Sequence, residues 1–346
     1  ELEGGSSEVP VNLDVHPKPP HEIRIGGGYS TLDDFGGQVQ WHDYNWGGDG
    51  RQLSALLRYA RINSMADVAL LQPYLLGDRD FQGKLEAAYI QQDWQTFILR
   101  AEQFKPQLVY NFTEQLVGTL GYQVEYAQLN NVDPTVVQQL GGIRHKGILT
   151  GPTLGLIWNT TDSQFYPTRG GIVTFAAEAA HRAIGSDFSY YRSTLDLRKY
   201  TLIAKKTVLA TRLKFGLADA LASRHDYPLF LRFFPGGDGS VRGYGYWRLG
   251  PKSASNDPVG GLSLFEGSVE LRHPIYRQLA GAVFLDFGQA TTHTYTFPTP
   301  IRFGFGPAIM YETPIGPLRL DLGIPAPRPP RGDQWWQIYF SIGQFF

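Results

Sequence analysis

The sequence has no cysteine, few charged residues and no long hydrophobic run. Without cysteine, the 346-residue chain can form neither a disulfide nor a Cys-based zinc site. Charged residues make up only 18% of the chain and the formal net charge is −1, so nothing predicts binding to nucleic acid, which depends on Lys and Arg contacts to phosphates. No stretch approaches the roughly 18 apolar residues of a membrane-spanning helix. Membrane-spanning strands are still allowed, because their alternating pattern gives only a weak hydropathy signal.

Motifs that carry enzymatic chemistry are also missing. The chain contains no G-x-S-x-G, H-E-x-x-H or Walker sequence, and its eight histidines are scattered. Gly26, Gly27 and Gly28 are not followed by the helix that a dinucleotide site requires. We therefore predict a protein that is not an enzyme and needs no cofactor or metal. A membrane-embedded hydrolase, with Ser and His from distant strands, is the alternative.

The sequence does have a dominant hydrophobic period of two. Along residues 207–217 the odd positions are mostly apolar, whereas Arg212 and Lys214 occupy even positions. Such strands fit two structures. In a soluble sandwich the apolar faces of two sheets pack together, whereas in a membrane barrel the apolar face contacts lipid and the polar face lines the lumen. The predicted strands are long against a soluble norm of about 5–6 residues. Aromatic residues such as Trp46 and Trp335 lie near strand ends, as in the rim girdles of membrane barrels, and this favours the barrel.

We predict an all-β fold, a sixteen-stranded antiparallel transmembrane β-barrel over residues 22–346. The predicted strands are 22–31, 36–46, 51–62, 66–76, 80–94, 96–105, 108–127, 147–159, 170–181, 187–203, 205–220, 227–235, 261–274, 280–289, 301–323 and 335–346. An even number lets the first and last strands meet in an antiparallel seam. Closure matters because an open edge in lipid would leave backbone groups unsatisfied. Longer connections are predicted at 128–146, 236–260 and 290–300.

The connection at 236–260 is unusual because it begins with five glycines within 11 residues. It carries Arg242, and acidic residues follow downstream at Glu270 and Asp286. Because a guanidinium can bond two carboxylates at once, these residues are candidates for an internal ion pair. An exposed Arg on a glycine-rich surface loop is an equally good interpretation of the residues alone.

Four stretches resemble motifs of the outer-membrane protein assembly and secretion superfamily of the BamA, TamA and two-partner transporter type. They are the loop motif Val241, Arg242, Gly243 and Tyr244, the strand motif 284–288, the middle hairpin 159–170 and the penultimate strand 314–321. A TamA-like barrel domain is the most similar. The resemblance implies a barrel of the bacterial outer membrane whose loop before strand thirteen folds into the lumen. It further implies that Arg242 meets Asp286, with Glu270 nearby, and locks the loop.

The same resemblance implies an insertase or translocase that assists client proteins through a lateral gate between strands 1 and 16. Gly26, Gly27, Gly28 and Gly343 would weaken that seam, although glycines that merely fit the barrel's curvature are the alternative. The expected partners are the lipid bilayer, unfolded outer-membrane or secreted clients, and a periplasm-spanning partner. A dedicated secretion pore for one passenger protein and a passive porin are the other functions left open.

Both ends of the chain carry further predictions. Phe340, Ile342 and Phe346 alternate outward and resemble the C-terminal signal of bacterial barrels, which is compatible with a plain lipid-facing strand. Members of the superfamily usually carry periplasmic POTRA domains before the barrel. We interpret residues 1–21 as an N-terminal segment that is the remnant of such a domain, with 9–15 as its last strand, and a member without those domains is the alternative.

Overall fold

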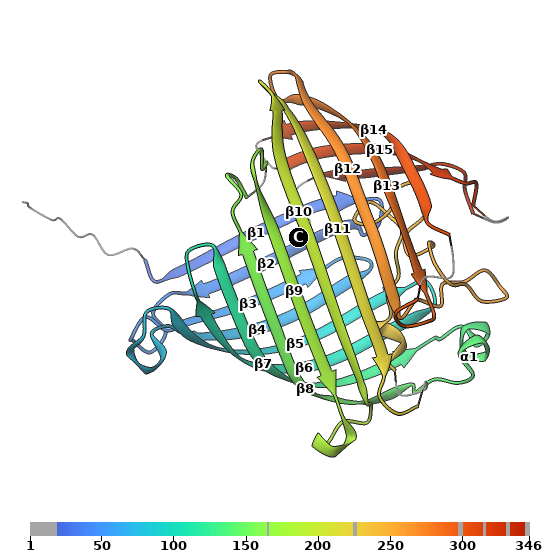
Figure 1. The fold of residues 1–346 in the computed structure, drawn as a ribbon. Helices are drawn as coiled ribbons and strands as arrows, with labels where there is room; N and C mark the ends of the chain where they lie inside the picture. The colour runs from blue at the N-terminus through green and yellow to red at the C-terminus, as the bar shows by residue number, and fades with distance from the viewer. Residues whose placement is uncertain are drawn as a thin grey trace, which may run out of the picture.

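The computed structural model describes residues 19–164, 166–223, 227–296, 300–313, 316–329 and 333–342. Within them, sixteen strands form a closed antiparallel barrel in which each strand pairs with its sequence neighbours and β1 pairs with β16 (Figure 1). The strands are β1 His21–Ser30, β2 Asp34–Asp43, β3 Gln52–Tyr59, β4 Asn63–Gln72, β5 Phe81–Trp94, β6 Phe97–Asn111, β7 Leu116–Asn130, β8 Lys146–Asn159, β9 Gly170–Ala180, β10 Tyr190–Ala204, β11 Thr207–Ala220, β12 Ser263–Tyr276, β13 Leu279–Thr291, β14 Arg302–Thr313, β15 Gly316–Ala326 and β16 Gln337–Ile342. This confirms the predicted fold class.

Short helical segments occur only in connections of the described chain: η1 Leu75–Gly77, α1 Pro134–Leu140, η2 Arg182–Ile184 and η4 Leu229–Leu231. The α1 helix begins where the side chain of Asp133 accepts a hydrogen bond from the backbone N of Thr135, and it ends at Gly141 in the left-handed conformation. In the part that the structure describes, no helix is long and apolar enough to cross a membrane.

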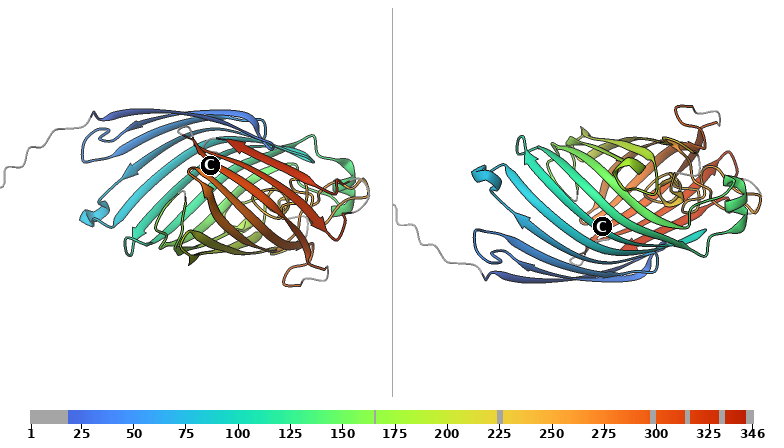
Figure 2. Two further views of the ribbon diagram at one scale, coloured as in Figure 1. Left: turned by 90° about the horizontal axis from the view of Figure 1, so that it is seen from above. Right: turned by 90° about the horizontal axis from the view of Figure 1, so that it is seen from below.

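The barrel has two unlike rims. Because sixteen antiparallel strands alternate in direction, the start of β1 and the end of β16 lie at one rim, which we call the terminal rim. The opposite rim, the loop rim, carries the long connections 131–145 and 221–262. Figure 2 shows α1 and the 221–262 connection together at this end of the barrel.

Strand alternation separates a lipid-type outer face from a polar inner face. Along β13, Val283 and Leu285 point outward and are exposed, whereas Phe284 and Asp286 point into the lumen and are buried. An apolar outer surface of this kind is stable in a bilayer and would aggregate in water. The pattern that predicted the strands therefore also fixes which side chains line the lumen.

Two strand predictions are wrong. One adds a strand and the other merges two strands into one, so the predicted total of sixteen is still correct. Residues 227–235 form no strand, because their apolar side chains, including Leu229 and Phe233, are buried in a loop cluster rather than arranged on a sheet. Residues 301–323 contain two strands, β14 and β15, and the continuous alternation concealed the boundary between them. The loop that carries Arg242 therefore precedes β12, not a thirteenth strand.

The boundaries of the sixth and seventh strands also differ from the prediction. The sixth strand does not stop before Pro106 but continues to Asn111, and β7 begins only at Leu116. The β6–β7 register has no pair at Lys105 or Pro106. Pro106 pairs with Leu85 of β5, so the proline lies inside β6 beside a gap in the ladder to β7.

Candidate functional site

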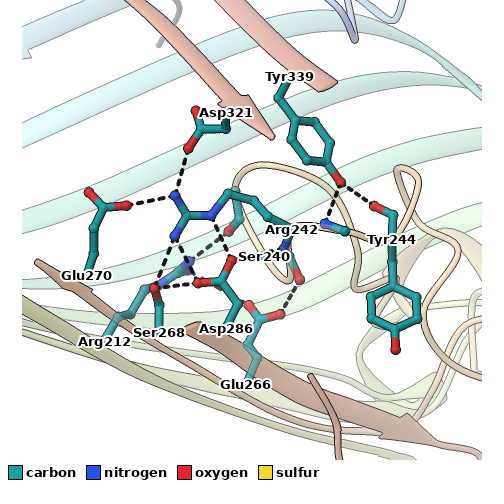
Figure 3. Close-up of polar contacts among 12 residues, drawn as sticks. Arg212, Ser240, Arg242, Tyr244, Glu266, Ser268, Glu270, Asp286, Asp321 and Tyr339 are labelled. Carbon is teal, nitrogen blue, oxygen red and sulfur yellow. Dashed lines mark hydrogen bonds and ion pairs between the residues drawn. The ribbon is translucent and has the colours of Figure 1, made fainter. Parts of the chain in front are cut away.

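The connection between β11 and β12 sends its glycine-rich part into the lumen. We call residues 236–246 the loop tip. Figure 3 shows the tip surrounded by side chains that project from the barrel wall. The tip is held at its centre by ion pairs, at its sides by close backbone packing, and near the seam by tyrosines.

Arg242 makes the central contact. Its Nε donates to Oδ2 of Asp286 at 2.7 Å and its Nη2 donates to Oδ1 at 2.9 Å. The backbone N of Arg242 also donates to Oδ2, at 3.0 Å. Asp286 is completely buried. This two-point guanidinium–carboxylate geometry is the strongest common form of a charged hydrogen bond.

Two further carboxylates complete the site. Nη1 of Arg242 donates to Glu270 Oε2 at 2.7 Å and to Asp321 Oδ1 at 2.8 Å (Figure 3). Arg319 bridges the same two acids, at 2.8 Å and 2.7 Å, and Arg272 donates to Glu270 at 2.6 Å. Three arginines thus face three acids, Glu270, Asp286 and Asp321, and their formal charges cancel.

The electrostatic environment favours a permanently charged Arg242. Burial works against the charge, but the carboxylates of Asp286 and Glu270 raise the pKa of Arg242 above its ordinary value. The guanidinium also lies over the ring of Phe284, 3.5 Å from the ring centroid, in a cation–π contact. In the described ranges, no group of three or more His, Cys, Asp or Glu residues could hold a metal ion.

The strand register brings the acids together. Ser268 on β12 pairs with Asp286 on β13, and its hydroxyl donates to Asp286 at 2.6 Å. Asp321 on β15 pairs with Tyr339 on β16. All four side chains point into the lumen because their strands have the same inward parity there. Residues far apart in the sequence therefore converge on Arg242.

Glycines on the wall allow the tip to approach the backbone. A Cβ atom on Gly304 of β14 would lie 1.7 Å from the carbonyl oxygen of Arg242, and one on Gly323 of β15 would lie 2.4 Å from the N of Gly243. Gly243 itself has φ +101°, which L side chains rarely adopt, and its Cβ would lie 2.9 Å from the N of Pro325. Tip and wall are fitted to each other at the backbone level.

The other residues of the loop motif are also buried. Val241 is fully buried, and Tyr244 is nearly so. The phenol of Tyr339 accepts a hydrogen bond from the N of Gly243 at 3.0 Å and donates to the carbonyl of Tyr244 at 2.6 Å. The structure thus brings together all six residues of the predicted loop lock: Val241, Arg242, Gly243, Tyr244, Glu270 and Asp286.

A polar cavity lies beside the tip. It has a volume of about 560 Å³, and its lining includes Arg212, Arg242, Glu270 and Arg319. Arg212 donates to the carbonyl of Gly239 at 2.7 Å and so holds the tip from the β11 side. A cavity of this size holds many water molecules, so the ion pairs are buried against protein on one side and wet on the other.

The described part of the seam joins the last residues of β1 to the last described residues of β16. β1 and β16 pair at Tyr29 with Ile342 and at Ser30 with Ser341, whereas β1 and β2 share ten pairs. The three glycines of the predicted gate, Gly26, Gly27 and Gly28, pair with β2, where they face Gln38, Gly37 and Gly36. No described residue of β16 pairs with them.

Several predicted residues at the chain ends can be placed only in part. Phe340 and Ile342 lie on the face of β16 opposite to the inward Tyr339. Gly343, Phe346 and the segment 9–15 lie outside the described residues.

Some residues of the site were missed by the sequence analysis. These are Ser268, Phe284, Arg319, Asp321, Tyr339 and the wall glycines Gly304 and Gly323. Asp321 closes the stretch 314–321, which was already singled out, and its inward parity with Arg319 was a usable signal. No local signal marked Tyr339, because its partner is a loop backbone nearly 100 positions away.

A closed barrel with an apolar outer face and a polar lumen defines a transmembrane β-barrel. A family profile described as the Omp85 superfamily domain matches residues 45–346. The chain belongs to the Omp85 superfamily and is an integral β-barrel of the outer membrane. Membership of this superfamily of assembly and transport barrels agrees with the prediction of a protein that is not an enzyme.

The relatives support this assignment at several levels. The chain is 28% identical over 235 residues to the outer membrane protein assembly factor BamA of Neisseria meningitidis serogroup B, covering 58% of this chain and 29% of the relative. It is similar in fold to BamA from Haemophilus ducreyi lacking POTRA domains 1–3, with a TM-score of 0.84 and 19% identity over 94% of this chain and 70% of the other. CdiB from Acinetobacter baumannii is less similar, with a TM-score of 0.59 and 13% identity over 94% of this chain and 60% of the other. The chain spans about three-tenths of the length of the BamA assembly factors from Neisseria meningitidis and Nitratidesulfovibrio vulgaris.

Proposed function

We propose that this barrel inserts client proteins into the outer membrane through a lateral gate between β1 and β16, and that the loop tip braces the wall beside that gate. The observation that carries the proposal is the clamp of Arg242 on β12, β13 and β15, since β15 is the strand that pairs with β16. A brace on the last strands of the barrel is useful if those strands must keep their shape while the neighbouring seam opens.

The chemistry of the gate is hydrogen bonding between backbones. An opened seam exposes a strand edge, and an unfolded client can add its own strand to that edge by β-augmentation. Glycines in β1 and in the facing part of β2 remove side-chain packing that would otherwise stiffen this part of the wall. The names of the BamA relatives, assembly factors of outer-membrane proteins, point in the same direction.

The loop rim argues against a passive porin. Buried apolar residues from α1, from the connections 181–189 and 221–262 and from strands β6 to β13 form one cluster at that end of the lumen, including Phe97, Val136, Phe188, Tyr227 and Phe233, and we call this cluster the apolar cap. Passive solute flow through a water-filled channel would have to pass this apolar cap. A dedicated secretion pore for one passenger protein is the second candidate, and it would require the cap to move aside.

Upstream domains complete the proposal. We infer that residues 1–21 lead into the barrel from a periplasmic domain that delivers the client. The structure of BamA from Haemophilus ducreyi lacks POTRA domains 1–3, and the BamA relatives are much longer than the stretch that matches this chain. A periplasm-spanning partner and unfolded clients are the corresponding proposed partners.

A reversible crosslink tests the gate. These 346 residues contain no cysteine, so the pair Tyr29→Cys and Ile342→Cys, which face each other across the seam, introduces the sole thiols of the barrel. The matched control is Ile25→Cys with Val39→Cys, which face each other across β1 and β2. In the full-length protein in liposomes, oxidation of the seam pair should stop insertion of an unfolded barrel client, and reduction should restore it.

The control pair should insert the client equally well when oxidised and when reduced. Normal insertion by the oxidised seam pair would refute the lateral gate. If the oxidised seam blocks insertion of membrane clients but a soluble passenger still crosses, the secretion pore is the better description.

A further inference from the structure

We infer that Tyr246 and Tyr339 are positioning residues that tie the loop tip to both strands of the seam, so that the tip must move when the seam opens. We call Thr31, Tyr246 and Tyr339 the seam latch. This inference rests on the proposed gate and adds a means of regulating it.

The β16 side of the latch is Tyr339. Its side chain points into the lumen and is almost completely buried. Its hydroxyl binds the N of Gly243 at 3.0 Å and the carbonyl of Tyr244 at 2.6 Å, so both hydrogen-bonding capacities of the phenol are used on the tip (Figure 3). The last strand therefore holds the tip directly, independently of the Arg242 ion pairs.

The β1 side of the latch is Thr31, the residue that follows β1. The hydroxyls of Tyr246 and Thr31 lie 3.3 Å apart, within hydrogen-bonding distance. The N of Thr31 donates to the carbonyl of Phe340 at 3.0 Å, which extends the seam ladder by one bond. Tyr246 therefore touches the point at which β1 and β16 come together.

A ring contact connects the two sides. The rings of Tyr246 and Tyr339 lie 5.5 Å apart at 85°, in an edge-to-face arrangement. The tip is shaped around this ring, because a Cβ atom on Gly237 would lie 2.3 Å from Tyr246. Gly237 also has φ +107°, so glycine is required there on two grounds. The position of Tyr246 is therefore set by the fold of the tip.

The consequence is a mechanical coupling. When the seam opens, Thr31 separates from Phe340, and Tyr246 cannot then keep its contacts with both Thr31 and Tyr339. Either the latch breaks or the tip shifts, and a shift strains the Arg242 ion pairs. By thermodynamic linkage, whatever stabilises the seated tip also stabilises the closed seam, and the reverse.

Spin labels on the outer face measure seam opening without touching the latch. Ile25→Cys on β1 and Ile338→Cys on β16 are both exposed, and neither contacts the tip in the described structure. In the full-length protein in liposomes, the distance distribution between the labels gives the fraction of open seam. Tyr246→Phe keeps the ring and removes a hydroxyl that bonds Thr31 and, within the tip, Asp238. It should raise the ratio of open to closed seam roughly two- to tenfold, because only the neutral hydrogen bond to Thr31 reaches the seam.

Thr31→Val removes the other hydroxyl and should have a similar effect. The Thr31 hydroxyl also accepts a hydrogen bond from the N of Phe340 at 3.4 Å, and the Tyr246 hydroxyl also bonds Asp238, so each change removes one bond of its own besides the shared bond. The double variant should therefore be less open than the two single effects combined would give, because the shared bond can be lost only once. Tyr191→Phe is the matched control, since it removes a tyrosine hydroxyl that bonds Tyr295 in a contact outside the latch. The control should leave the label distances unchanged.

The outcomes separate the latch from the gate. Unchanged distances in both Tyr246→Phe and Thr31→Val, with folded barrels, would overturn the latch. If in addition the oxidised seam pair still blocks insertion, the proposed gate stands without the latch. Fully additive effects in the double variant would also overturn the latch, since the hydroxyls of Thr31 and Tyr246 would then act independently of each other.

Discussion

Replacing Gly304 with alanine should move the loop tip without removing any charged group. The added Cβ would lie 1.7 Å from the carbonyl oxygen of Arg242, whereas real contacts of this kind are rarely shorter than 3.0 Å. Both the wall and the tip are backbone here, so no side chain can rotate away. The tip must therefore retreat by more than about 1 Å if it is to accommodate the added methyl group.

The expected cost follows from this displacement. Overpacking a fitted interior by one methyl group costs about 1–3 kcal/mol. The backbone N of Arg242 bonds Asp286 at 3.0 Å, and a retreat of about 1 Å breaks that bond. If the tip leaves altogether, the loss approaches the roughly 3–5 kcal/mol of a broken buried ion pair, reduced by the water that the adjacent cavity admits.

Two measurements check this prediction. The unfolding temperature of the barrel, read from heat-dependent gel mobility, should fall by several degrees. Trypsin should cleave the tip at Arg242 faster than in the unmodified protein, because Arg242 is buried while the tip is seated. The matched control is Gly155→Ala on β8, whose Cβ would have an ordinary 3.5 Å contact with Thr119. If Gly304→Ala and Gly155→Ala behave alike in both measurements, the fitted brace is wrong.

Three further changes test the charges around the tip. Arg242→Ala should lower the unfolding temperature and client insertion together, because it leaves buried carboxylates without their central cation, and unchanged values of both would refute the lock. Asp286→Asn should have a smaller effect, since the amide keeps one acceptor for the guanidinium, and a larger loss than for Arg242→Ala would contradict the assigned geometry. Partial burial opposes ionisation of Asp333, but Lys252 and Arg248 hold its pKa below the ordinary value. The stabilisation by Asp333 should be complete above about pH 4 and disappear as the pH falls through the lowered pKa, so unfolding temperatures of Asp333→Asn and the unmodified protein should differ at neutral pH and converge in acid.

The sequence predicted those features that depend on short-range pattern. A period of two is visible within a single strand, and it identified both the barrel class and the inward position of Asp286. The glycine content of the tip marked it as a segment that can fold back tightly. The partners of Arg242 came from the resemblance to the superfamily, since acids on two separate strands carry no local sign of meeting.

The features that the sequence did not predict depend on how strands are aligned with one another. Residues 227–235 have the apolar character of a strand, but they pack as a loop under the cap because β11 has already ended at Ala220. Tyr339 meets the tip only because the barrel closes and places β16 beside it. A shift of one residue in that register would turn Tyr339 out to lipid, so its role cannot be inferred before the register is known.

The membrane determines when the seam can open. In lipid no water is present to form hydrogen bonds with the backbone groups of two separated strands, and each unsatisfied group costs several kcal/mol. Opening the seam breaks at least its two described residue pairs and the added bond from Thr31. Opening is therefore favourable only if an incoming strand takes up the freed groups. Under the proposed mechanism, a closed seam with a seated tip is therefore the resting state, and a client strand supplies the hydrogen bonds that allow the tip to release.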